Sequence, residues 1–217
     1  MKLFKTYIFL FFITLLPFSC GQNLQIPDNC STVNAEVLIY PDYKEVTIPK
    51  NIAPLNFKIE NDGEEFIVNI KGKNNSILVG AEKDGKVHID SVAWRNLLAD
   101  ANGSSLELQV YSLSNGKWLK HPSFKINVAK EPIDPFLFYR LIEPSYELYR
   151  QLGIYQRNLE NFTEEAVYTN NRSYEEKNNH CVNCHSFQNY SSQRMLFHVR
   201  AKHGGTVLID HKGVRKL

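Results

Sequence analysis

Apolar and polar residues alternate without interruption in the stretch Leu106-Glu107-Leu108-Gln109-Val110-Tyr111. A period of two sends successive side chains to opposite faces of a β-strand, so one face should be buried and the other should meet water. Phe124-Lys125-Ile126-Asn127-Val128 alternates in the same way, and the tight-turn dipeptide Asn115-Gly116 stands between the two stretches. The sequence therefore predicts two half-buried strands here, in a chain that is mainly β.

More short strands bounded by Pro or Gly precede this region, at 45–48, 55–59, 65–70, 76–80 and 86–89. The last two strands flank the turn Lys83-Asp84-Gly85, whose Asp-Gly pair is typical of a hairpin. About seven strands within residues 35–130 predict an immunoglobulin-like β-sandwich. The Cys…Trp…Cys pattern of antibody domains is absent, so this prediction concerns architecture alone.

One helix is expected among these strands, from Val92 to Ala99. Asp90 or Ser91 can cap its start, and Gly103 can end it. Its apolar residues Trp94, Leu97 and Leu98 fall on one side, so we expect the helix to cover the open end of the sheet.

The N-terminus has the composition of an export signal, predicted at residues 1–20. Lys2 and Lys5 precede an apolar run from Tyr7 to Leu16. At about ten residues, this run is too short to span a bilayer. Cys20 follows Ser19 as in a bacterial lipobox, which predicts a lipid anchor on Cys20 and a position on the periplasmic side of a bacterial membrane. Ordinary signal cleavage, or a Cys20–Cys30 disulfide that would exclude lipidation, are the alternatives.

Residues 21–34 are polar and are predicted to form a tether from the membrane. The chain has 25 basic and 23 acidic residues. Without Lys2 and Lys5 the numbers of basic and acidic residues are equal, and this neutral balance argues against a nucleic-acid partner.

The segment Cys181-Val182-Asn183-Cys184-His185 has the C-x-x-C-H spacing that attaches c-type haem. Cys181 and Cys184 would form the thioether bonds, and His185 would be the proximal iron ligand. His198 and Met195 are the first candidates for the sixth ligand, and His203 is the next. Residues 169–193 are rich in Asn, Ser and Gln, so this haem site is expected in a loop.

Other chemistry also fits the two cysteines. With His198 and His203 they have the spacing C-x₂-C-x₁₃-H-x₄-H, which matches a zinc-site template. A redox-active thiol pair and a structural disulfide are further alternatives. Haem enzymes such as peroxidases need a distal acid–base pair, and the sequence offers nothing for that role beyond His198.

The segment from Gly204 to Asp210, followed by Lys212 to Val214, is predicted to be a hairpin. Such a hairpin needs a partner sheet to be stable. It is expected either to pair with residues 153–168 or to begin a longer structure. Too few residues follow His185 for an ordinary class I cytochrome c domain, so the haem is expected to be held by a small insertion that packs against another domain.

Several segments resemble a family of exported Bacteroidetes proteins described as TolB-like, or loosely as cytochrome c biosynthesis proteins. The similar segments are 39–43, 52–57, 139–148, 153–157, 183–187, 197–200 and 204–206. The resemblance implies a sandwich followed by a β-propeller, with the C-x-x-C-H in a loop of the first blade. Family members are longer, so residues 131–217 would hold only the C-x-x-C-H segment and the start of a TolB-like propeller.

These observations together predict a membrane-tethered, periplasm-facing c-type haem protein that transfers electrons or senses redox state. No motif in the sequence indicates the redox partner. The alternative is an envelope scaffold or binding module, whose Cys/His cluster binds zinc or is vestigial.

Overall fold

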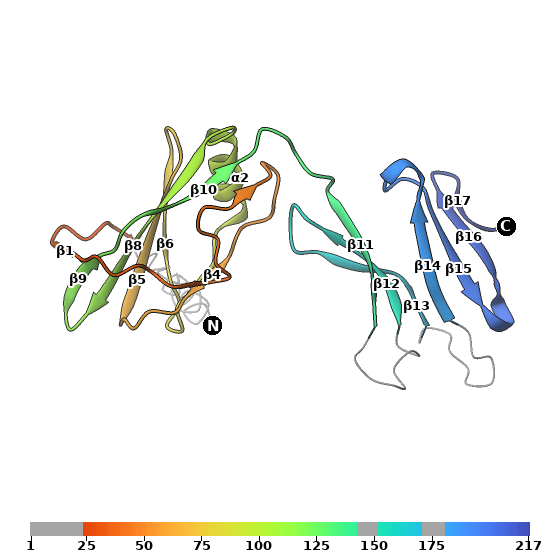
Figure 1. The fold of residues 1–217 in the computed structure, drawn as a ribbon, viewed down its shortest axis with the longest axis horizontal. Helices are drawn as coiled ribbons and strands as arrows, with labels where there is room; N and C mark the ends of the chain where they lie inside the picture. Colours follow the sequence, from red (N-terminus) through yellow and green to blue (C-terminus); the bar gives the residue numbers. More distant parts are fainter. Residues whose placement is uncertain (1–23, 143–151, 171–180) are drawn as a thin grey trace, which may run out of the picture.

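The computed structural model describes residues 24–142, 152–170 and 181–217 (Figure 1). The predicted signal peptide and Cys20 lie outside the described residues. Strands dominate the fold, and the sheets formed by the described residues do not close into a barrel. None of the helices in these three ranges has the length and apolar character needed to cross a membrane.

Strand β8 (Ser105–Ser114) is the centre of the largest sheet. It pairs with β5 (Glu65–Lys71) along one edge, and with β10 (Phe124–Val128) and β9 (Lys117–Lys120) along the other. The predicted alternation is confirmed up to Val110, because Leu106, Leu108 and Val110 are buried, but Tyr111 on the opposite face is buried as well. The strands β1 (Cys30–Thr32), β3 (Thr47–Ile48) and β6 (Ser76–Gly80) complete this sheet.

A smaller sheet of β2 (Ile39–Tyr40), β4 (Phe57–Ile59) and β7 (Lys86–Val87) shares a hydrophobic core with the large sheet. We call the two sheets together, residues 30–128, the N-terminal β-unit. Helix α2 (Ser91–Asp100) packs on the same core through Trp94, Leu97 and Leu98, as the sequence predicts.

The start of α2 is set by Asp90, whose carboxylate accepts hydrogen bonds from the backbone N–H groups of Val92 and Ala93 at 3.0 and 2.9 Å. This N-cap satisfies two donors that the first helical turn leaves free. Gly103 adopts a φ of 68° in the turn after the helix. The predicted cap is confirmed, whereas the helix ends at Asp100 with Ala101 as its C-cap, before the glycine expected to end it.

Strand β1 lies within the stretch expected to be a tether. It pairs in parallel with β9, and the N–H of Val33 donates to the Lys120 carbonyl at 3.0 Å. Polar, exposed residues make up most of this strand, so it lacks the apolar alternation by which the other strands were predicted.

Two more sheets follow the connector Glu131–Pro135. The first, called the middle sheet, contains β11 (Phe136–Leu141), β12 (Gly153–Asn158) and β13 (Glu164–Thr169). The second, called the C-terminal sheet, is an antiparallel meander of β14 (Cys181–Phe187), β15 (Met195–Arg200), β16 (Gly205–Asp210) and β17 (Gly213–Lys216). The middle sheet lies between the N-terminal β-unit and the C-terminal sheet (Figure 1).

The middle and C-terminal sheets pack against each other around a second core. Ile154 of β12 and Val182 of β14 are fully buried there, together with Met195, Phe197 and Val199 of β15. Residues far apart in the sequence thus share one apolar layer. We call the face of the C-terminal sheet that meets this core its inner face, and the opposite one its outer face.

The expectation that the C-x-x-C-H lies in a loop is wrong, because it begins strand β14. Polar composition indicated a loop, but Val182 and Phe187 supply enough apolar surface for a strand against the second core. The hairpin predicted near residues 204–214 is confirmed as β16 and β17. It pairs with β15 rather than with residues 153–168.

Candidate site on the C-terminal sheet

A β-bulge lies inside the C-x-x-C-H motif. Val182 pairs with Val199 and His185 pairs with Phe197, so Asn183 and Cys184 together face the single residue His198. An extra residue in one strand bends that strand and changes the direction of nearby side chains. The bulge therefore places the second cysteine next to the histidine that the sequence suggested as a partner.

Both cysteines belong to the outer face of the sheet. Cys181 pairs with Arg200, an exposed residue that points away from the second core, and Cys184 is exposed. Neither thiol forms a disulfide within the described residues. The outer face thus carries two thiols from one strand, of which Cys184 is exposed and Cys181 is partly buried.

His185 belongs to the inner face. It pairs with the buried Phe197, and its ring lies 6.1 Å from that of Phe187 in an edge-on arrangement. Phe187 in turn lies 4.4 Å from Phe138 of the middle sheet, measured between ring centroids. The imidazole is therefore directed toward the aromatic edge of the second core.

The candidates for the sixth iron ligand are divided between the two faces. Met195 is only 3% exposed and belongs to the second core. His198 is exposed on the outer face, where its Nδ1 lies 3.3 Å from the Thr206 hydroxyl. His203 ends the 3-10 helix η5 (Ala201–His203), directly after β15.

The residue types fit covalent haem, but the conformation of β14 does not. Cys184 and His185 are consecutive in an extended strand, so their side chains leave opposite faces. One haem held by both thiols on the outer face is out of reach of His185 on the inner face. Attachment requires residues 181–185 to leave the β14 ladder.

Zinc binding meets a similar difficulty. Cys181, Cys184 and His198 share the outer face, as zinc binding would require. Across the residues that the structure describes, however, no three His, Cys, Asp or Glu side chains come close enough to hold a metal ion. The zinc-like spacing therefore does not correspond to a preformed site.

The outer face also carries an apolar hollow that the sequence did not suggest. Leu196, Leu208 and Leu217 line it, with Arg194 at its margin. Leu196 is an exposed leucine at an outer position of β15.

Arg194 and Arg215 hold the carboxylate of Asp210 at 3.6 and 2.9 Å. The N–H of Lys212 donates to the same carboxylate, and this hydrogen bond, followed by those from Arg215, lowers the pKa of Asp210. A charged cluster thus fixes the turn between β16 and β17.

No family model and no curated protein sequence matches the chain. The resemblance to TolB-like proteins therefore stays a prediction.

Proposed function

We propose that the chain is an exported, lipid-anchored c-type haem protein of the periplasmic side of a bacterial membrane, which transfers electrons or senses redox state. The observation that carries this proposal is the pair of thiols at haem-attachment spacing on one face of the sheet, neither of them in a disulfide within the described residues. Cysteines with a purely structural role would be expected to form a disulfide or to be buried in a core.

Within this proposal, Cys181 and Cys184 hold the porphyrin, and His185 is the proximal ligand. Covalent haem supplies a one-electron couple whose potential depends on the axial ligands. Among the candidates for the other axial position, His198 is favoured over Met195. It shares the face of the thiols, whereas Met195 would have to leave the second core.

The bulge makes the required rearrangement local. Ladder pairing is already interrupted between Val182 and His185. The pairs from Ser186 onward, together with the complete β15–β16 ladder, can keep the rest of the sheet in place. Attachment then alters one end of β14 and not the whole sheet.

The proposed architecture is an immunoglobulin-like sandwich followed by the start of a β-propeller. Two sheets around one core support the first part. A four-stranded antiparallel meander, packed face to face on a neighbouring sheet, supports the second, since this is the unit from which propellers are built.

The experiment is expression of the full chain with and without a haem c maturation system, followed by haem staining of a denaturing gel. A stained band is expected only with maturation, and Cys181→Ala/Cys184→Ala should abolish it. Cys30→Ala is the matched control and should keep the stain. An unstained wild-type band from a strain that matures other c-type cytochromes would refute the proposal.

The alternative of an envelope scaffold that binds zinc is favoured by one observation. Cys181, Cys184 and His198 share the outer face, whereas His185 does not. Metal analysis of the purified protein distinguishes the two proposals. One zinc per chain and no Soret band would support the scaffold.

A further inference from the structure

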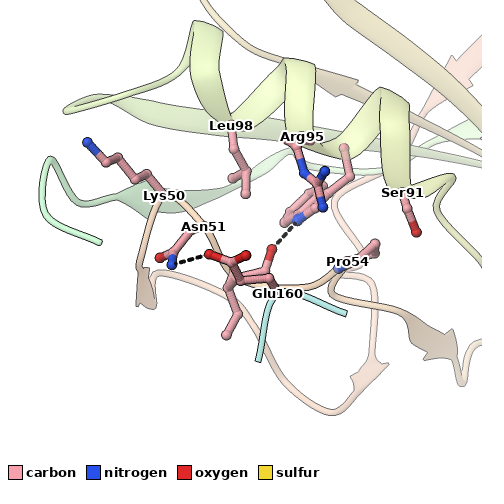
Figure 2. A pocket seen from close by; sticks show the side chains of 9 residues that line it. Lys50, Asn51, Pro54, Ser91, Arg95, Leu98 and Glu160 are labelled. Carbon is pink, nitrogen blue, oxygen red and sulfur yellow. Dashed lines mark hydrogen bonds between the residues drawn. The ribbon is translucent and has the colours of Figure 1, made fainter. Parts of the chain in front are cut away.

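A pocket of about 250 Å³ lies where the N-terminal β-unit meets the middle sheet (Figure 2). Helix α2 contributes Trp94, Arg95 and Leu98, the segment 50–54 forms a second wall, and Glu160 reaches in from the turn between β12 and β13. Ligand sites occur preferentially at such junctions between structural units. Its volume corresponds to roughly eight water molecules, which suits a small metabolite.

The walls of the pocket are fixed by hydrogen bonds across the junction. The Asn51 amide group donates to the Ile133 carbonyl at 2.9 Å and to one oxygen of Glu160 at 2.8 Å, and its own oxygen accepts the Ile133 N–H at 2.9 Å. The Ala53 N–H also donates to the Leu159 carbonyl at 2.8 Å. Glu160 is thereby held in position before any ligand arrives.

Opposite charges face this pocket without meeting. Among the described residues, Arg95 has no ion pair, and the second carboxylate oxygen of Glu160 has no hydrogen bond. Arg95 extends from α2 toward the side from which Glu160 rises (Figure 2). A ligand that carries an anionic and a cationic group can bridge such separated charges, and a planar carboxylate suits the guanidinium fork.

The floor of the pocket is apolar. Trp94 and Leu98 are buried, and Pro54 lies beside them. The indole N–H of Trp94 is already satisfied by the Ile52 carbonyl at 3.0 Å, so the ring offers the ligand only an apolar surface. This arrangement selects a small molecule that carries an apolar side chain in addition to its two charges.

From these features we infer that the pocket binds a free α-amino acid with an aliphatic side chain. Arg95 receives its carboxylate, the free oxygen of Glu160 receives its ammonium group, and Trp94, Leu98 and Pro54 contact the side chain. Lys50 also lines the pocket and adds a second positive charge to its wall. This inference does not depend on the haem proposal.

The test is a titration of the full chain with L-leucine, followed by the NMR signal of the Trp94 indole N–H. Trp118, which lies in β9 outside the pocket, is the internal control. Two analogues isolate the charges, since 4-methylpentanoate lacks the ammonium group and 3-methylbutylamine lacks the carboxylate. Leucine is expected to shift the Trp94 signal alone and to bind at least about tenfold more tightly than either analogue, because each charged contact is worth about that factor.

Variants assign the contacts. Arg95→Gln should weaken leucine binding about tenfold and leave the binding of 3-methylbutylamine unchanged. Glu160→Gln, whose side-chain oxygen can still accept the hydrogen bond from Asn51, should also weaken leucine binding about tenfold and leave the binding of 4-methylpentanoate unchanged. Lys117→Gln, on an exposed hairpin, should change nothing. Amide spectra show whether each variant is folded. Equal affinity for leucine and its analogues, or no Trp94 shift at millimolar leucine, would overturn the inference.

Discussion

His185 and His198 lie on adjacent strands of the C-terminal sheet but on opposite faces of it. At the bulge of Asn183 and Cys184, the exposed Cys184 lies opposite His198, while His185 remains beside Phe187. The described strand thus separates the groups that one haem would have to bring together. A local change at residues 181–185 is therefore part of the proposed function.

The first prediction concerns the sixth iron ligand. In protein with attached haem, His198→Ala should change the visible spectrum, because it removes the exposed imidazole on the face of the thiols. Met195→Leu should leave the spectrum unchanged and cost less than about 1.5 kcal/mol of stability, since the two side chains are similar in volume. The opposite pattern in the absorption spectra would place methionine at the iron.

The second prediction concerns thiol reactivity in the haem-free protein. Cys184 should be alkylated first, because it is exposed, and Cys30 last. Burial raises the pKa of the Cys30 thiol, so less of the reactive thiolate is present at neutral pH. Mass spectrometry after timed treatment with iodoacetamide gives the order. Faster modification of Cys30 than of Cys184 would show that β14 shields its thiols.

The predictive power of the sequence differed between the two halves of the chain. Strict alternation predicted β8, and Asp90 with Gly103 predicted α2 closely, because both signals are local. Strand β1 was missed since its polar residues join an existing edge by backbone pairing alone. The loop expected around Cys184 is a strand, because contact with the second core outweighs polar composition there.

The sites show the same contrast. Spacing suggested the C-x-x-C-H and its histidine partners, and the structure places Cys184 opposite His198 as a consequence of the bulge. Spacing could not reveal that His185 faces the other way, since this depends on strand geometry. The pocket at Arg95 and Glu160 left no sequence signal, because its walls come from three separate segments.

The third prediction concerns the junction between the N-terminal β-unit and the middle sheet. Asn51→Ala should lower the free energy of unfolding by about 1–3 kcal/mol, because it removes three hydrogen bonds and leaves partly buried partners unsatisfied. Asn34→Ala, at an exposed position, should stay within about 0.5 kcal/mol of the wild type. Urea denaturation of both variants measures the difference, and equal stability would mean that Asn51 does not hold the junction.

The fourth prediction concerns acid sensitivity. Because the folded-state pKa of Asp210 is lowered, its charged form stabilises the fold at neutral pH. That contribution should be lost as the pH falls from the ordinary aspartate range through the lower folded-state value. Asp210→Asn should therefore have a lower melting temperature at neutral pH, and the gap to the wild type should shrink in acid. Melting curves across pH check this.

The control for that experiment is Asp62→Asn. Within the described residues, Asp62 takes part in no hydrogen bond or ion pair, so its replacement should leave the pH profile of the melting temperature unchanged. A gap between Asp210→Asn and the wild type that widens in acid would contradict the assigned role of the Asp210 cluster.

The most direct test of the central claim is the intact mass of the full chain purified from a strain that matures c-type haem, measured after denaturation. A mass increase of one haem is expected, located by fragmentation to the peptide that contains Cys181 and Cys184. An unmodified peptide with two free thiols, from cells that mature other c-type cytochromes, would contradict it.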